Sequence, residues 1–143
     1  MDTSRTDDLV GRIVQAMIGI QEIGGIYLGD KLGLYRSLHE DGPATSIGLV
    51  ARLHMDERYL REWLEYQAVL GYLDVDDVAA PVQQRLYTLP AEHAIVLAEP
   101  EHPYHMASAG PIMLGMVRPL DQLIDAYRSG AGVPYEAYGR DMV

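Results

Sequence analysis

The segment KLGLYRSLHEDGPATSIGLVARLHMDERYLREWLEYQAVLGYL, residues 31–73, decides the fold of this 143-residue chain. Its apolar residues recur at helical spacing in three runs, and each run is bounded by residues that start or stop helices. The first predicted helix covers 31–39 and stops at Gly42-Pro43. Thr45 or Ser46 can cap a second helix by accepting backbone N–H groups. On one side of that helix we place Ile47, Val50, Ala51 and His54.

A third helix is predicted over 57–70, with Asp56 as its cap. Its apolar stripe comprises Leu60, Trp63, Leu64 and Ala68, and its solvated side carries the i,i+4 pairs Glu57–Arg61, Arg58–Glu62 and Arg61–Glu65. Gly71 ends this helix, and residues 72–75 alternate as a strand does. A second strand at 86–89 returns after a polar connection. The pattern predicts a mainly α fold, a winged helix-turn-helix with a small two-stranded wing.

The chain before this segment predicts one further helix, which begins at Asp7 or Asp8 and is apolar nearly all round. Gly24-Gly25 indicates either a break or a close helix crossing. Because a chain of this length has few elements to cover such a helix, we predict that it is a dimerisation helix packed against a second copy. The alternative is a central core helix of a monomer. The predicted dimer interface consists of Leu9, Ile13, Met17 and Ile20.

The chain after the wing predicts a short helix or turn at 91–98, a linker at 99–103 and a helical arm at 104–128. Pro119 should kink the arm, and the glycines at 130 and 132 should end it. We therefore divide the chain into a winged-helix domain with the dimerisation helix, residues 1–98, and a linker with a kinked arm, residues 99–143.

Composition excludes several classes of protein. The chain has no cysteine, which excludes disulfides and thiolate metal sites. We find no secretory leader and no run of about 18 apolar residues, so we expect a cytoplasmic protein without a membrane span. The net charge is −10, with Lys31 as the single lysine. Nucleic-acid binding depends on Lys and Arg side chains that neutralise phosphates. Because acidic residues predominate in the third helix, we do not expect a nucleic-acid partner.

The sequence supplies no complete catalytic or metal-binding constellation. The glycine clusters at 24–25, 110–115 and 130–132 follow no strand-like run, so we assign them to helix contacts and caps rather than to a cofactor loop. His102 and His105, near Glu101 and His93, are separated by Pro103 and fit a surface loop better than a metal site. His39 and His54 are helix-end residues. No serine lies in a nucleophile elbow.

Four separated blocks carry a family resemblance: GDKLGLY (29–35), YLREWL (59–64), LYTLPAEH (86–93) and GVPYEAYG (132–139). In this order they resemble the N-terminal part of a bacterial family of S-adenosylmethionine-dependent methyltransferases. Members carry a winged helix ahead of a Rossmann-like catalytic domain, and some are labelled transcriptional regulators.

The resemblance implies a dimerisation and substrate-covering region that is inactive alone, because the cofactor domain of the family would lie beyond residue 143. On this basis we expect the chain to be a truncated product or a fragment. The cofactor S-adenosylmethionine is expected for the full-length family but not in this chain. The apolar first helix predicts a homodimer, and a small apolar substrate between the helices is a further candidate partner.

The resemblance places candidate substrate-facing residues in the arm: Met113, Met116, Tyr127, Tyr135 and Tyr138. The alternative is that this stripe packs on the winged helix of its own or a partner chain. Two other functions stay open, a winged-helix transcriptional regulator that binds DNA and an interaction module for a full-length relative.

Overall fold

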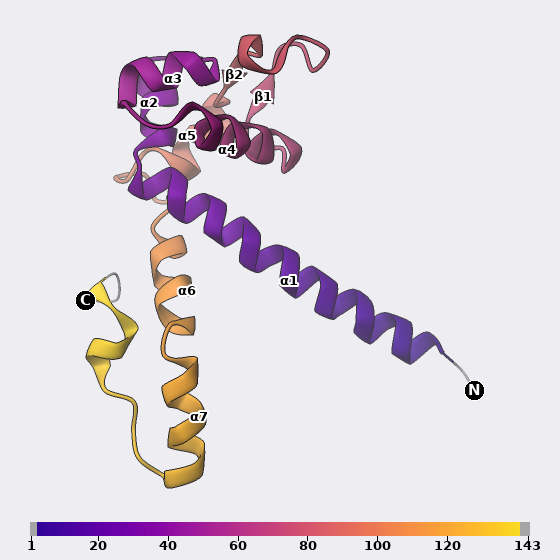
Figure 1. Ribbon diagram of the computed structural model, residues 1–143, viewed down its shortest axis with the longest axis vertical. Coiled ribbons are helices and arrows are strands. Elements are labelled where there is room, and N and C mark those ends of the chain that lie inside the picture. The colour runs from indigo at the N-terminus through magenta and orange to yellow at the C-terminus, as the bar shows by residue number, and fades with distance from the viewer. Residues whose placement is uncertain (1–2, 141–143) are drawn as a thin grey trace.

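A winged helix-turn-helix forms the body of the molecule in the computed structural model, which describes residues 3–140 (Figure 1). Helices α2 (Leu34–Glu40), α3 (Ser46–Leu53) and α4 (Glu57–Val69) enclose one hydrophobic core, and α5 (Ala91–Leu97) closes it from the side of α2. The predicted mainly helical winged helix-turn-helix is confirmed. The largest core side chains are Leu34, Tyr35, Leu38, Leu49, Leu60, Trp63, Leu64, Leu73 and Tyr87.

The wing is a two-stranded antiparallel sheet of β1 (Asp74–Val75) and β2 (Tyr87–Thr88). Its register pairs Asp74 with Thr88 and Val75 with Tyr87. On the other side of β2, Tyr87 exchanges two backbone hydrogen bonds with Ala44, at 3.0 and 2.9 Å. The strands are shorter than the predicted 72–75 and 86–89. The connection between them contains a 3-10 turn, η1 (Val82–Gln84).

Side-chain caps position the two helices of the helix-turn-helix as predicted. Of the two candidates for α3, Thr45 is the cap, and its hydroxyl accepts from the Gly48 N–H at 3.1 Å. Asp56 caps α4 by accepting from the Tyr59 N–H at 3.3 Å. Gly71 follows α4 with a φ of 77°, a conformation that favours glycine.

The side of α3 on which we placed Ile47, Val50, Ala51 and His54 is not the buried face of the helix. Ile47 is 53% exposed and Ala51 is also exposed, whereas Leu49 and the small Ser46 are fully buried. Seven of the eight residues of α3 are apolar, glycine or small, so spacing alone did not select a face. Packing against α4 selected the face that carries Leu49.

Helix α1 (Ser4–Lys31) is one continuous 28-residue helix, so the predicted break at Gly24-Gly25 does not occur. The other prediction for this pair, a close helix crossing, is confirmed at Gly25. A β-carbon there would lie 2.7 Å from Gln67 Nε2, and the Trp63 indole donates to the Gly25 carbonyl at 2.9 Å. The first predicted helix of the body is shorter than expected, because residue 31 ends α1 and α2 begins at Leu34.

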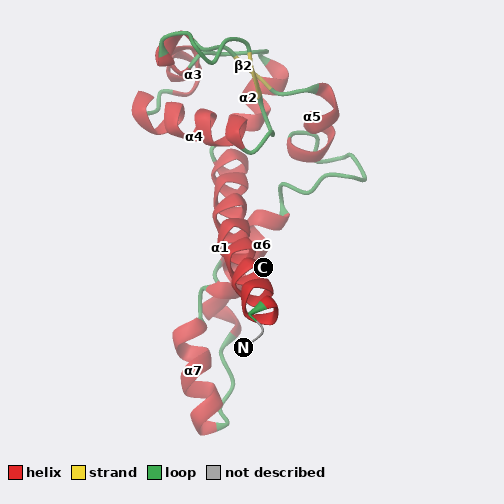
Figure 2. Ribbon diagram, turned by 90° about the vertical axis from the view of Figure 1, so that its right-hand side faces the viewer, coloured by secondary structure: helices red, strands yellow, loops and turns green. Residues whose placement is uncertain are grey.

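The chain after α5 runs through turns to α6 (Ala109–Val117) and α7 (Leu120–Ser129). Pro119 separates these helices, which confirms the predicted kink, and Gly130 ends α7 with a φ of 75°. The 3-10 turn η2 (Tyr135–Tyr138) then packs back on α6. Helices α1 and α6–α7 therefore leave the body as two diverging arms (Figure 1), and both extend from the same side of the body (Figure 2).

Candidate interaction surfaces and pocket

The first candidate surface is the N-terminal half of α1. Every residue from position 3 to 18 is exposed, so no part of the described chain covers this half. The residues that we predicted to form a dimer interface share one stripe at spacings of four, four and three. Their exposed fractions are 55% for Leu9, 53% for Ile13, 62% for Met17 and 52% for Ile20.

Helix α1 is also long and apolar enough to span a membrane, judged by length and composition alone. The sequence prediction concerned an uninterrupted apolar run of about 18 residues, which α1 does not contain, whereas this criterion uses average composition over such a length. The core helix of a soluble protein meets the same criterion. The C-terminal part of α1 contacts α2, α4 and α6, and the polar residues Arg12, Gln15 and Glu22 interrupt its apolar surface.

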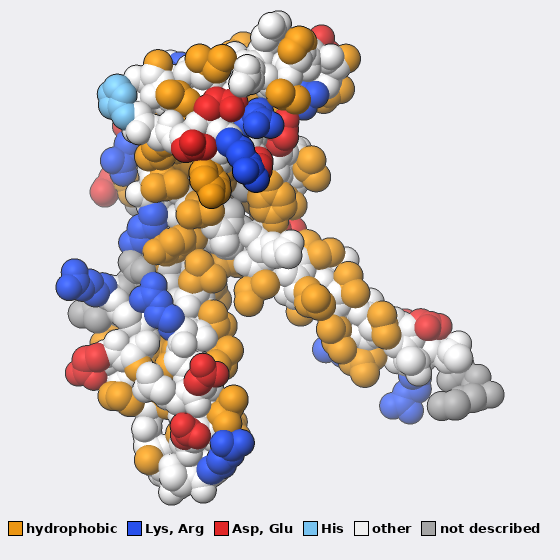
Figure 3. Space-filling model, viewed as in Figure 1, with side chains coloured by type: hydrophobic (Ala, Val, Ile, Leu, Met, Phe, Trp, Pro, Cys, Tyr) orange, Lys and Arg blue, Asp and Glu red, His pale blue; other side chains and the backbone are white. Residues whose placement is uncertain are grey.

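The second candidate surface is the arm formed by α6 and α7. Its exposed apolar residues are Ile112, Met113, Met116, Val117, Leu120, Leu123, Ile124 and Tyr127. Figure 3 shows apolar side chains along both arms on the visible face. The arms meet where Gly110 crosses α1, because a β-carbon at Gly110 would lie 3.1 Å from the Tyr27 backbone nitrogen. The predicted helix-contact role of this glycine is confirmed.

The five predicted substrate-facing residues are distributed over three elements of the arm. Met113 and Met116 lie on α6, and Tyr127, which is 87% exposed, lies on α7. Tyr135 and Tyr138 pair in η2 with ring centroids 6.3 Å apart.

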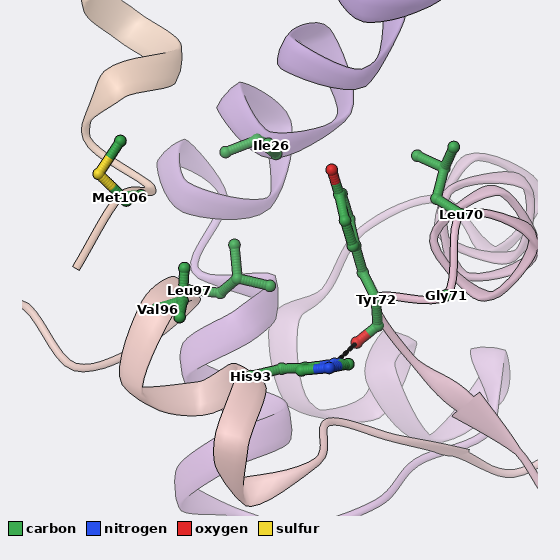
Figure 4. Close-up of a pocket in the computed structure, with 8 residues that line it drawn as sticks. All are labelled: Ile26, Leu70, Gly71, Tyr72, His93, Val96, Leu97 and Met106. Carbon is green, nitrogen blue, oxygen red and sulfur yellow. Dashed lines mark hydrogen bonds between the residues drawn. The ribbon is translucent and has the colours of Figure 1, made fainter. Parts of the chain in front are cut away.

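A pocket of about 410 Å³ lies where α1, α5, the end of α4 and the segment before α6 meet (Figure 4). It is lined by Ile26, Leu70, Gly71, Tyr72, His93, Val96, Leu97 and Met106. The sequence did not predict this pocket, because its residues come from four segments. The single early signal was His93, which we considered only as a remote metal ligand.

Two hydrogen bonds order the polar side of the pocket. His93 Nδ1 lies 2.9 Å from the Tyr72 carbonyl oxygen, and the Tyr72 hydroxyl donates to Glu22 Oε2 at 3.3 Å. Burial, followed by the nearby Glu22 carboxylate, raises the pKa of the Tyr72 hydroxyl. The phenol therefore stays neutral at physiological pH and forms a fixed wall between α1 and α5.

Four arginines of the winged helix are already engaged by acceptors within the chain. Three form ion pairs with carboxylates, and Arg52 donates to the carbonyls of Gly42 and Pro43. The predicted Arg61–Glu65 pair is wrong, because Glu65 binds an arginine of the wing instead. The ion pairs are Arg58–Glu62 at 2.9 Å, Arg61–Glu57 at 3.2 Å and Arg85–Glu65 at 3.1 Å.

Two of the three histidines considered as metal ligands have other partners, whereas the buried Nδ1 atom of His105 has no hydrogen-bond partner among the described residues. His102 Nδ1 accepts from the Tyr104 N–H at 3.2 Å, and His93 is bound to Tyr72. His39, at the end of α2, lies 3.8 Å from Glu99, and His54 is the C-cap of α3. Over residues 3–140, no three His, Cys, Asp or Glu side chains are grouped so that they could hold a metal ion.

Comparisons with solved structures find the same fold in methyltransferases. PigF in complex with SAH is 25% identical, with a TM-score of 0.66 over 85% of this chain and 34% of its own. The mitomycin 7-O-methyltransferase MmcR is 22% identical, with a TM-score of 0.65 over 96% of this chain and 38% of its own. Human N-acetylserotonin methyltransferase with SAM is 19% identical, with a TM-score of 0.69 over 98% of this chain and 40% of its own.

The chain thus spans about a third to two fifths of the length of these methyltransferases. Its fold matches an N-terminal region of S-adenosylmethionine-dependent O-methyltransferases. No curated protein matches the chain. The sequence profile of one domain family, the Rv2258c-like winged HTH domain, matches residues 25–99. That match covers α2 to α5 and the wing, so the chain belongs to the Rv2258c-like winged helix-turn-helix domain family.

Proposed function

We propose that this chain is the dimerisation and substrate-covering region of an S-adenosylmethionine-dependent methyltransferase. The observation that carries the proposal is the pair of diverging arms, whose apolar side chains stay largely exposed within the described chain. The fold that the chain shares with PigF, MmcR and the human enzyme supports it. A winged helix in this setting is a structural scaffold for the arms.

A second copy of the chain suits the arms on energetic grounds. The four stripe residues of α1 are each about half exposed. Burying the remaining half contributes about 1 kcal/mol per side chain, and a symmetric interface counts each residue twice. Helix α1 cannot fold back on its own body, because it is continuous from Ser4 to Lys31. A homodimer covers the stripe without breaking the helix.

The cofactor is proposed to bind outside residues 1–143. PigF and the human enzyme were solved with SAH and SAM respectively, whereas one glycine from each of the three glycine clusters of this chain has another role. Gly25 and Gly110 permit helix crossings, and Gly130 ends α7. None of the three lies between a strand and a helix, where a phosphate- or nucleoside-binding turn belongs.

Substrate covering is proposed for Met113, Met116, Tyr127, Tyr135 and Tyr138. Flexible thioethers and exposed phenols suit an apolar ligand that other parts of the enzyme enclose. The regulator alternative is less well supported, since four arginines of the winged helix already bind acceptors within the chain. Phosphate binding would have to break those pairs.

Light scattering after size-exclusion chromatography tests the dimer. We expect a dimer at micromolar concentration, and a monomer for the double variant Ile13→Glu/Met17→Glu. The matched control is Val78→Glu, which places a charge on a 70% exposed valine of the wing connection. A monomeric wild type, or a double variant that remains dimeric, would overturn the proposed interface.

Isothermal titration calorimetry with S-adenosylmethionine tests the cofactor proposal separately. We expect no saturable heat with the 143-residue chain, whether it is dimeric or monomeric. Saturable binding at micromolar cofactor would place the cofactor site within this chain and contradict the proposal, even if the dimer were confirmed.

A further inference from the structure

We propose that the pocket between α1 and α5 binds a small, uncharged, mainly apolar ligand that carries one hydrogen-bond donor. This proposal does not depend on dimerisation or on methyl transfer, because every residue of the pocket belongs to one chain. The five substrate-facing candidates of the arm are not among its lining residues. The pocket is therefore a separate site.

The size and walls of the pocket suit a small molecule. Its volume of about 410 Å³ falls in the range of roughly 300–1,000 Å³ that is typical of ligand sites. Ile26, Val96 and Met106 supply apolar walls from three different segments (Figure 4). Gly71 has a φ of 77°, which favours glycine, and it places no side chain in the pocket. An apolar body would therefore contact aliphatic groups on several sides.

The hydrogen-bonding preference of the pocket follows from the tautomer of His93. A carbonyl oxygen can only accept, so the Nδ1 atom that lies 2.9 Å from the Tyr72 oxygen must carry the proton. In neutral imidazole the other nitrogen, Nε2, is then an acceptor. No other group among the described residues is hydrogen-bonded to Nε2. A ligand hydroxyl or N–H can donate to it.

The charge preference follows from the other polar residue. The Tyr72 hydroxyl already donates to Glu22, and no Lys, Arg, Asp or Glu lines the pocket. An anionic ligand would find no cation in the wall, and a cationic ligand would find no carboxylate there, because Glu22 is not among the lining residues. An uncharged ligand avoids both desolvation costs.

The probe that we choose is 2-naphthol, compared with 2-methoxynaphthalene, which has a similar ring system but no donor. Binding is measured by protein NMR shifts and by probe fluorescence. We expect saturable 1:1 binding of 2-naphthol, with shifts at Ile26, Val96 and Met106 and at the imidazole nitrogens of His93. Absence of saturable binding, or shifts confined to α6 and α7, would overturn the proposal.

Two variants and one control separate the hydrogen bond from the cavity. His93→Phe keeps a ring but removes the acceptor, so 2-naphthol affinity should fall about three- to tenfold while 2-methoxynaphthalene affinity stays unchanged. Val96→Trp should abolish binding of both probes by filling the cavity. Val69→Trp, at an 84% exposed position of α4, should leave both affinities unchanged.

Each opposite result has a defined meaning. Equal losses for both probes in His93→Phe would contradict the hydrogen bond, and this variant carries the test if Val96→Trp does not fold. A second copy of the chain is the rival occupant of the pocket. If 2-naphthol affinity falls as protein concentration drives dimerisation, the pocket belongs to the dimer interface and the ligand proposal is wrong.

Discussion

Substituting Gly29 with alanine should destabilise the protein, because the body of the winged helix leaves no room for a methyl group there. A β-carbon at Gly29 would lie 2.3 Å from Tyr35 Cε2 and 2.7 Å from Trp63 Cζ2. Both rings are buried, with 1% and 7% of their surface exposed. They pack edge to face at 5.1 Å between centroids.

Neither ring is free to swing away from a methyl group. The Tyr35 hydroxyl donates to the buried Gln67 side chain at 2.5 Å, and the Trp63 indole donates to the Gly25 carbonyl at 2.9 Å. Overpacking of this kind costs about 1–3 kcal/mol. Alanine in place of glycine also favours the helix by about 1 kcal/mol, so a wild-type comparison alone would underestimate the clash.

Gly24→Ala is the matched control that removes this ambiguity. Gly24 lies in the same helix, and a β-carbon there would meet nothing within 4 Å. Both variants gain the same helix propensity, so the difference between their free energies of unfolding isolates the steric cost. We expect Gly24→Ala to be about 1 kcal/mol more stable than wild type, and Gly29→Ala to be about 1–3 kcal/mol less stable than Gly24→Ala.

Urea unfolding, followed by circular dichroism and by the fluorescence of the single tryptophan, measures both values. All proteins must be compared at one concentration, because dimerisation would add to the apparent stability. If Gly29→Ala and Gly24→Ala agree within about 0.5 kcal/mol, the close packing of α1 on Tyr35 and Trp63 is wrong.

Three further predictions concern single groups of the winged helix. Asp56→Ala removes the cap of α4 and should cost about 1 kcal/mol in urea unfolding; an unchanged midpoint would contradict the cap. Burial raises the pKa of Tyr35 well above its usual range. The neutral Tyr35 phenol therefore contributes fully to the free energy of unfolding below the pKa of about 10 that it has in the unfolded chain, and this contribution is lost as pH rises above that value. Tyr35→Phe should then reduce the fall in stability at alkaline pH. The Ser46 hydroxyl, which donates to Glu57 at 2.6 Å, contributes most to a lowered pKa of that carboxyl. Ser46→Ala should raise the pKa in a carbon-13 NMR titration, and an unmoved value would contradict that cause.

Local sequence signals predicted the parts of the fold that depend on neighbouring residues. Asp56 and Gly71 bound α4 because a carboxylate cap and a residue with positive φ act within one helical turn. Pro119 separates α6 from α7, because proline lacks the N–H that a continuous helix needs. The stripe of Leu60, Trp63 and Leu64 was sufficient to place α4 in the core.

Local sequence patterns were less informative where contacts between distant segments decide the structure. The glycine pair of α1 indicated a break as well as a crossing, and only the rings opposite Gly25 and Gly29 decided for a continuous helix. The i,i+4 rule paired Arg61 with Glu65, but the wing delivered Arg85 to that carboxylate. Sequence spacing within α4 contains no information about a residue that arrives from the wing.

The sequence by itself determined the helix-turn-helix, the wing, the kinked arm and the apolar character of α1, since caps, breakers and periodicity are local properties. Only the tertiary structure decided which face of α3 is buried and where the two arms diverge. It alone assembled the pocket of Ile26, Tyr72, His93, Val96 and Met106. Those residues are up to 80 positions apart, and their meeting depends on how α1, α4 and α5 pack around one core.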